Sequence, residues 1–264
     1  MFGLLPAIVV DLGMKSINVR FWLMPLFFSC TQKPEITAQH VIDEAIKAHG
    51  GDAYTTINYT FTFRDKSYSA TRKGGEFRYN RIFADSIGNV EDVLTNNGFI
   101  RYRNGQAVEL DTAKAQAYQS SVNSVHYFNL LPFGLNDEAV NKKYLGIAML
   151  DSASYHKIKV TFSQEGGGED FEDEFIYWFN TETATLDYLA YSYEEENKNG
   201  ELEKGYRFRK AYNPRVIGGI RFQDYINYKP SVKIENLEQL EALYHKQQVV
   251  EVSRIETTDI QMVK

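Results

Sequence analysis

The side chains that most often perform catalysis or bind metals are few in this sequence, and they are widely spaced. There is one cysteine, and the five histidines are His40, His49, His126, His156 and His245. His40 and His49 fall on one expected helix, but nine residues separate them, so they should not meet at one metal. The sequence has no His-Glu-x-x-His, Gly-x-Ser-x-Gly, Walker or Cys-x-x-Cys pattern. We therefore expect no catalytic residue, cofactor or metal centre.

Two weaker possibilities for chemistry remain open. A hydrolase could use His126 or His156 with a carboxylate such as Asp151 or Asp173, although the presence of titratable side chains is its only support. The acidic stretch 165–174 surrounds three glycines and could supply oxygen ligands to Ca²⁺. Its carboxylates lack the regular spacing of a calcium loop, so a solvated hairpin is the better interpretation.

The single cysteine, Cys30, ends a segment that is typical of an export signal. Lys15 and Arg20 precede the apolar run Phe21–Phe28, and the small residue Ser29 comes directly before Cys30. The run is too short to span a membrane. The segment resembles a bacterial lipoprotein signal, and a cysteine at the cleavage position then predicts a lipidated N-terminus, which two or three acyl chains would hold at a membrane. A plain secretory peptide, or a buried free cysteine, is the alternative.

These features divide the chain into three parts. We expect a signal peptide over residues 1–29, a lipidated tether over 30–36 and one domain over 37–264, and Met14 makes a more ordinary start of the signal than Met1. The formal net charge is −6 and no basic run is present, which disfavours nucleic-acid binding. No cysteine follows Cys30, so no intramolecular disulfide can form. The predicted location is the bacterial cell envelope, at either face of its outer membrane.

Helical periodicity occurs in three segments, which are residues 37–49, 112–128 and about 237–244. Thr37 is the expected N-cap of the first helix, and Gly50 with Gly51 provides its C-terminal end. Most of the remaining chain alternates between apolar and polar residues. Residues 57–64 are apolar at every odd position and polar at every even one, which is typical of a half-buried strand.

The same alternation recurs along the chain, and Asn-Gly and Gly-Gly pairs mark hairpin turns between the segments. The later segments lie at about 77–83, 100–102, 158–162, 206–208, 220–228 and 249–255. About a dozen antiparallel strands favour a mainly β (α+β) fold, in which one strongly curved sheet or open β-barrel has two or three helices packed in or over its mouth.

A barrel of this size poses the question of what fills it. About eight strands can be filled by their own side chains, whereas a larger barrel leaves room inside. The interior is therefore either an apolar cavity or a core filled by helices and aromatic rings. Candidate ligand-binding residues are Phe61, Phe63, Phe77, Tyr79, Tyr102, Phe128, Leu131, Phe133, Phe162, Phe208 and Phe222, and the proline-broken segment 130–135 is expected to form a mobile rim.

Several short motifs carry a resemblance to known proteins. They are His49-Gly50-Gly51 before the β segments, Leu131-Pro132-Phe133-Gly134-Leu135 with Asp137, Val160-Thr161-Phe162 leading through three glycines to Asp173, Leu186-Asp187-Tyr188 and Tyr206-Arg207-Phe208-Arg209. Over most of residues 35–260 the chain resembles an uncharacterised family of bacterial envelope lipoproteins and, more distantly, the lipoprotein-carrier (LolA-like) half-barrel fold. This resemblance implies an open barrel that shields acyl chains, but it transfers no activity.

The sequence thus favours a non-enzymatic, lipid-anchored protein that is monomeric and binds an acyl chain, lipid or lipoprotein. A structural or protein-interaction scaffold with a filled core is the alternative.

Overall fold

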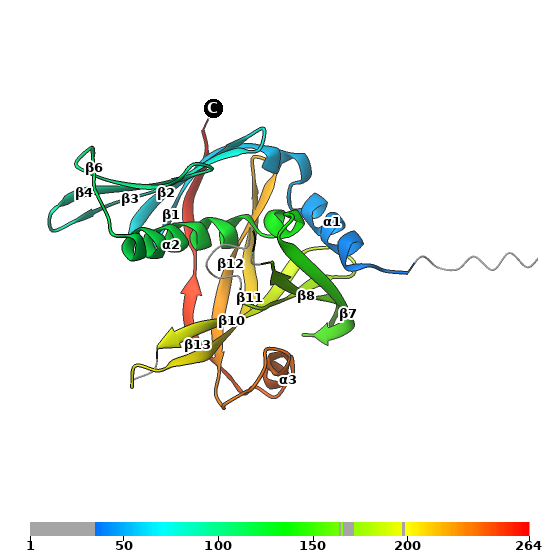
Figure 1. The fold of residues 1–264 in the computed structure, drawn as a ribbon. Coiled ribbons are helices and arrows are strands. Elements are labelled where there is room, and N and C mark those ends of the chain that lie inside the picture. Colours follow the sequence, from blue (N-terminus) through cyan, green and yellow to red (C-terminus); the bar gives the residue numbers. More distant parts are fainter. Residues whose placement is uncertain (1–34, 164, 166–171, 197–198, 264) are drawn as a thin grey trace, which may run out of the picture. The chain divides into compact units, whose positions relative to one another are not determined.

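Fourteen strands form two antiparallel seven-stranded sheets in the computed structural model of this chain (Figure 1). The structure describes residues 35–163, 165, 172–196 and 199–263. The chain divides into two units, Met1–Glu35 and Ile36–Lys264, and all the elements below belong to the second. The predicted signal peptide and Cys30 lie outside the described residues.

The first sheet follows the order β14-β1-β2-β3-β4-β5-β6. Its strands are β1 (Thr56–Phe63), β2 (Lys66–Lys73), β3 (Glu76–Asp85), β4 (Gly88–Thr95), β5 (Gly98–Arg103), β6 (Gln106–Ala107) and β14 (Thr257–Met262). The second sheet follows the order β13-β12-β11-β10-β9-β8-β7. Its strands are β7 (Val140–Leu150), β8 (Ala153–Phe162), β9 (Phe175–Asn180), β10 (Leu186–Glu196), β11 (Leu202–Ile217), β12 (Ile220–Pro230) and β13 (Val249–Ile255).

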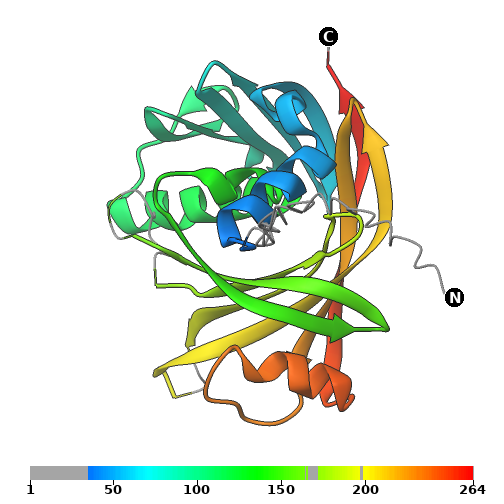
Figure 2. The ribbon, with the colours of Figure 1, turned by 90° about the vertical axis from the view of Figure 1, so that its right-hand side faces the viewer.

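The C-terminal strand segment joins the two sheets. Only Glu256 separates β13 from β14, yet β13 pairs with β12 whereas β14 pairs with β1 (Figure 2). In the described part of the chain, β6 and β7 end the two sheets without pairing to each other. The strands therefore form a strongly curved surface that stays open, as the alternating sequence predicts.

Three α-helices accompany the sheets in the described residues, and they are α1 (Ala38–His49), α2 (Thr112–Leu130) and α3 (Gln239–His245). Thr37 caps α1 as expected, because its side-chain oxygen accepts a hydrogen bond from the His40 amide at 3.2 Å. The short 3₁₀ helices Gly51–Thr55 and Phe133–Asn136 follow α1 and α2. Figures 1 and 2 show α1 and α2 between the two sheets, where α2 packs against β3, β4 and β5.

The centre of the second sheet, around β9, is buried on both faces. One face carries Ile158, Tyr177 and Leu189, which pack in a core with α1. On the other face, Trp178 and Phe208 pack against Leu240 of α3. The Trp178 indole N–H also donates to Glu241 Oε2 at 3.1 Å. Apolar residues are therefore required on both sides of these strands, which explains the continuous apolar run of β9.

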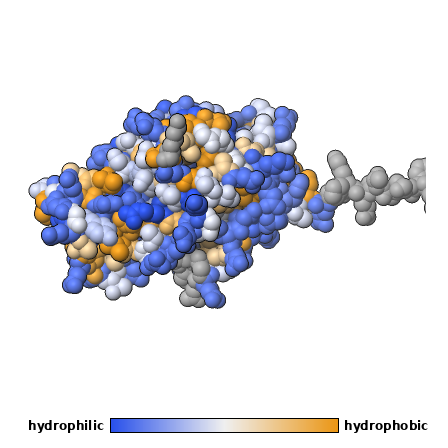
Figure 3. All heavy atoms as spheres, turned by 90° about the horizontal axis from the view of Figure 1, so that it is seen from above, coloured by the Kyte–Doolittle hydropathy of each residue, from blue (hydrophilic) through white to orange (hydrophobic). Residues whose placement is uncertain are grey.

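The outer side of the first sheet faces solvent. Seen from above, hydrophilic and hydrophobic residues intermingle on this side (Figure 3), and Ile82, Ile87 and Ile100 are among its exposed apolar side chains. Across residues 35–163, 165, 172–196 and 199–263, no helix combines the length and apolar character that crossing a membrane requires.

Candidate ligand-binding site

A large open cavity, of about 1460 Å³, lies between α2 and the strands of both sheets. Small-molecule sites commonly measure about 300–1,000 Å³, so this one can accept a sizeable ligand. Beside it, Tyr59, Phe61 and Phe222 form a closely packed core against the first sheet. The interior thus contains both arrangements that the sequence left open, a filled core and a cavity.

One side of the cavity is an aromatic wall, formed by Phe128 of α2, Phe162 of β8, Phe175 of β9 and Tyr191 of β10. The Phe175 and Tyr191 rings are stacked with centroids 5.6 Å apart, and the Phe128 centroid lies 5.4 Å from that of Tyr191. Phe162 meets Phe175 edge to face at 5.7 Å. Rings in such mutual contact provide a large apolar surface with little freedom to rearrange.

Next to it is a polar wall, formed by Arg209 of β11, Asn227 of β12 and Ser253 of β13. The three residues are cross-strand neighbours, because Arg209 is paired with Asn227 and Asn227 with Ser253. The Asn227 amide donates to Ser253 Oγ at 3.1 Å. The inner face of this sheet is therefore aromatic at β8–β10, and at β11–β13 it adds these polar side chains beside Tyr225 and Ile255.

Arg209 is the cation among the three residues of the polar wall, and only 7% of its surface is exposed. Its Nη2 donates to the Tyr191 hydroxyl at 2.7 Å. The guanidinium carbon lies 4.1 Å from the Phe128 centroid and 4.9 Å from the Tyr191 centroid, so both rings make cation–π contacts. Burial lowers the pKa of Arg209 from its ordinary value.

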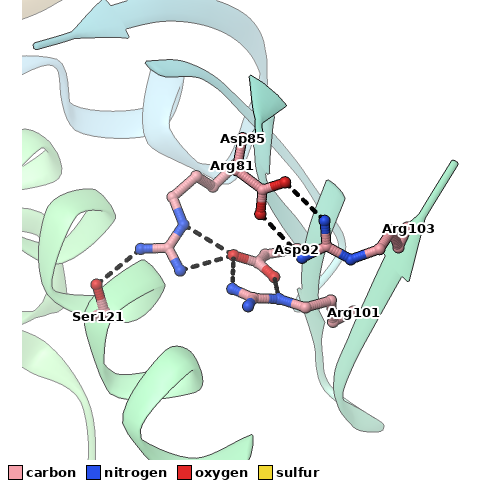
Figure 4. Close-up of polar contacts among 6 residues, drawn as sticks. All are labelled: Arg81, Asp85, Asp92, Arg101, Arg103 and Ser121. Atoms are coloured by element: carbon pink, nitrogen blue, oxygen red, sulfur yellow. Dashed lines mark hydrogen bonds and ion pairs between the residues drawn. The ribbon is translucent and has the colours of Figure 1, made fainter. Parts of the chain in front are cut away.

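The position of α2 over the first sheet is fixed by a buried ionic cluster (Figure 4). Arg81 and Arg101 both donate to the fully buried carboxylate of Asp92, at distances of 2.6–2.9 Å. Arg81 also donates to Ser121 Oγ of α2 at 2.7 Å. The Arg101 guanidinium lies 3.5 Å from the centre of the Tyr118 ring, on the same helix. Two arginines of the sheet thus hold the helix that forms one side of the cavity.

The structure brings together only some of the predicted lining residues. Phe63, Phe77, Phe128 and Phe162 line the cavity. The residues that instead pack in the neighbouring cores are Phe61, Tyr79, Leu131, Phe133 and Phe222. The segment 130–135 forms no rim, because its leucines are buried and Phe133 stacks on Tyr54 at 4.9 Å.

Two predicted residues face away from the cavity. Tyr102 follows the inward-facing Arg101 on β5 and therefore lies on the opposite face of the sheet. Phe208 packs against α3, and its neighbours Arg207 and Arg209 line the cavity. Sequence reasoning missed both arginines. The alternation of residues 206–209 contained the signal, but it does not say which face is the inner one.

The hydrolase hypothesis required a histidine beside a carboxylate. His126 is fully buried and stacks on Tyr79 at 4.3 Å, and burial lowers its pKa to about 3. His156 Nδ1 and the Tyr144 hydroxyl share a hydrogen bond of 3.1 Å. Asp151 accepts from Tyr188, Lys210 and Tyr244. Within the described residues neither histidine hydrogen-bonds to a carboxylate, and no three metal-ligating side chains are grouped.

Three solved structures are similar to this chain at low identity. A LolA superfamily protein from Nitrosomonas europaea is 11% identical, with a TM-score of 0.47 over 87% of this chain and 95% of that chain. A DUF1329 family protein from Desulfovibrio piger is 9% identical, with a TM-score of 0.46 over 86% and 94%. A putative outer membrane lipoprotein-sorting protein domain from Vibrio parahaemolyticus is 7% identical, with a TM-score of 0.36 over 85% and 93%. The first of these is named for the carrier group that the sequence resembles.

The sequence comparisons define the family. No curated protein sequence matches the chain. The model of a family of unknown function, DUF6503, matches residues 16–257, which is most of the chain, and this protein therefore belongs to the DUF6503 family.

Proposed function

We propose that this protein is a non-catalytic binding protein that holds an apolar ligand, such as an acyl chain, in the cavity beside α2. The observation that carries the proposal is the aromatic wall, because Phe128, Phe162, Phe175 and Tyr191 present contiguous ring surface to a cavity of about 1460 Å³. Binding sites for small apolar molecules are concave, mostly apolar and furnished with a few polar groups. The ligand would lie along the adjoining aromatic and polar walls, and the protein would act as a monomer.

Native mass spectrometry of the full chain, purified without detergent, tests this function. The expected result is a reproducible added mass that organic extraction removes and that is identified as a lipid. A bare protein mass that stays unchanged after incubation with bacterial envelope lipids would contradict the proposal and favour a scaffold role.

A pair of tryptophan substitutions on α2 locates the ligand. Ser124 lines the cavity, whereas Gln116 is exposed on the same helix away from it. Ser124→Trp should fill part of the cavity and reduce the bound lipid, whereas Gln116→Trp should leave it unchanged. Equal lipid binding by both variants would place the ligand elsewhere.

We also propose that the protein is anchored in the bacterial cell envelope by lipidation of Cys30. The support is the basic, apolar and small-residue pattern that precedes this cysteine. Wild-type protein should fractionate with membranes and incorporate labelled fatty acid, and Cys30→Ser should do neither. A wild-type protein without incorporated label would refute the anchor without bearing on the cavity.

A further inference from the structure

Arg209 differs from the other strongly buried arginines in the described part of the chain. Arg81 and Arg101 each pair with the Asp92 carboxylate. Arg209 has no carboxylate within 4.0 Å among the described residues, and its Nε–H has no hydrogen-bond partner there. Among the described residues, its side chain hydrogen-bonds only to the neutral Tyr191 hydroxyl. Within this part of the chain, the buried positive charge at the cavity thus has no negative partner.

Burial of such a charge is energetically unfavourable. A buried ion without a partner loses its hydration and gains little in return, and buried polar groups are normally hydrogen-bonded. The Phe128 and Tyr191 rings compensate in part through cation–π contacts. They also hold the guanidinium in place. Because Arg209 lines the cavity, an anionic ligand would approach its guanidinium from there.

The neighbouring residues indicate what kind of ligand this would be. A planar guanidinium edge matches the oxygens of a carboxylate or phosphate, which it can bind through two parallel hydrogen bonds. Phe128 and Tyr191 contact Arg209 and also belong to the aromatic wall, which continues to Phe175. A ligand bound at Arg209 would therefore have apolar surface directly beside its charged group.

The other charged groups of the cavity do not satisfy Arg209. Arg207 lines the same cavity two residues away, where its guanidinium lies 4.8 Å from the Tyr193 centroid. The acidic residues Asp173 and Glu194 also line the cavity, and among the described residues no ion pair joins either of them to Arg209. Asn227 Oδ1 is an acceptor on the neighbouring strand, but neither it nor the Arg209 Nε–H forms a hydrogen bond among the described residues. An acceptor of the Arg209 N–H is thus missing from the described residues.

We propose that the ligand is an amphiphile with a carboxylate or phosphate headgroup, which accepts hydrogen bonds from Arg209 while its apolar chain lies along the aromatic wall. This inference rests on the proposed apolar-ligand function and adds the headgroup that the cavity selects. It also identifies Arg209 as the residue that determines this selectivity.

Competition between three probes with the same chain tests the inference. The full-length protein is incubated with an equimolar mixture of hexadecanoate, hexadecyl phosphate and hexadecan-1-ol, and the complexes are compared by native mass spectrometry. The variants are Arg209→Met, which removes the charge but keeps an apolar side chain, and Lys210→Met, which removes a cation from the opposite face of the same strand. Circular dichroism verifies that both variants are folded.

Wild type and Lys210→Met should bind one or both anionic probes about ten- to a hundredfold better than the alcohol, because hydrogen bonds to charged groups are worth that much. The two anions distinguish a carboxylate from a phosphate headgroup. Arg209→Met should bind all three probes at the level of the alcohol.

Equal binding of all three by wild type would overturn the role of Arg209 and leave the apolar-ligand function standing. No binding of any probe would count against both. If Arg209→Met fails to fold, the wild-type preference for anions still decides the headgroup, and Arg209→Lys, which keeps the charge, should preserve part of that preference.

Discussion

Asp92 is the carboxylate on which the attachment of α2 depends, and Asp92→Asn should destabilise the protein strongly. Its side chain is fully buried and accepts four hydrogen bonds, two from Arg81 and two from Arg101. The two guanidiniums are only 8% and 9% exposed. Asparagine keeps the shape of the side chain but leaves both cations without a negative partner. Removing one member of a buried ion pair costs about 3–5 kcal/mol, and we expect the upper part of this range because two cations are affected.

Urea unfolding followed by circular dichroism measures this loss, and a second ion pair in the same sheet provides the control. Asp85 accepts two hydrogen bonds from Arg103, as Asp92 does from each of its arginines, but this pair lies at the surface. Asp85→Asn should change the free energy of unfolding far less. Arg81→Met combined with Asp92→Asn should be less destabilising than the sum of the two single variants, since one stranded charge is removed. Equal losses for Asp85→Asn and Asp92→Asn would refute the reasoning.

Three further predictions concern stability. Burial lowers the pKa of His126 to about 3, so the unfolded chain binds a proton at this residue at higher pH than the folded chain does. This difference should lower the free energy of unfolding by about 1.4 kcal/mol per pH unit as pH drops below 6.5. His126→Phe should remove this contribution, and identical pH profiles of the unfolding free energy for wild type and variant would contradict the prediction. Leu240→Ala should lower the free energy of unfolding by about 2–5 kcal/mol, because it leaves a cavity under α3. It should also shift the fluorescence of Trp178, and an unshifted spectrum would mean that α3 does not cover this ring. Thr37→Ala should cost about 1 kcal/mol in thermal or urea unfolding, because the amide of His40 loses its acceptor, and Thr37→Ser should retain most of the stability.

The elements of the fold could be predicted closely from the sequence. The apolar stripe and cap residue of the first helix define α1, and the segment expected to close the sheet coincides with β13. Local patterns suffice here, because helix periodicity, strand alternation and Asn-Gly turns depend on neighbouring residues. The division of the strands between two sheets could not be predicted, since it depends on the pairing of β1 with β14 across about two hundred residues.

The face that each strand presents to the cavity was predicted less well. Phe208 and Arg209 occupy adjacent positions on β11, and hydrophobicity alone assigns the phenylalanine to the interior. The structure has two interiors, because α3 buries one face of this sheet and the cavity lies at the other. Phe208 lies in the first of these, beneath α3. The rule that apolar side chains point inward therefore fails to identify a charged residue that lines the cavity.

The strand that joins the two sheets also sets the order in which the protein can be completed. During synthesis β13 and β14 leave the ribosome after every other strand described, so the edges of β1 and β12 stay without these partners until residues 249–262 have emerged. Exposed strand edges are templates for pairing with other chains. A nascent molecule of this kind therefore carries the open edge of β1 for most of its translation and that of β12 only after residue 230. Any factor that escorts it would need to shield these edges until the last strand arrives.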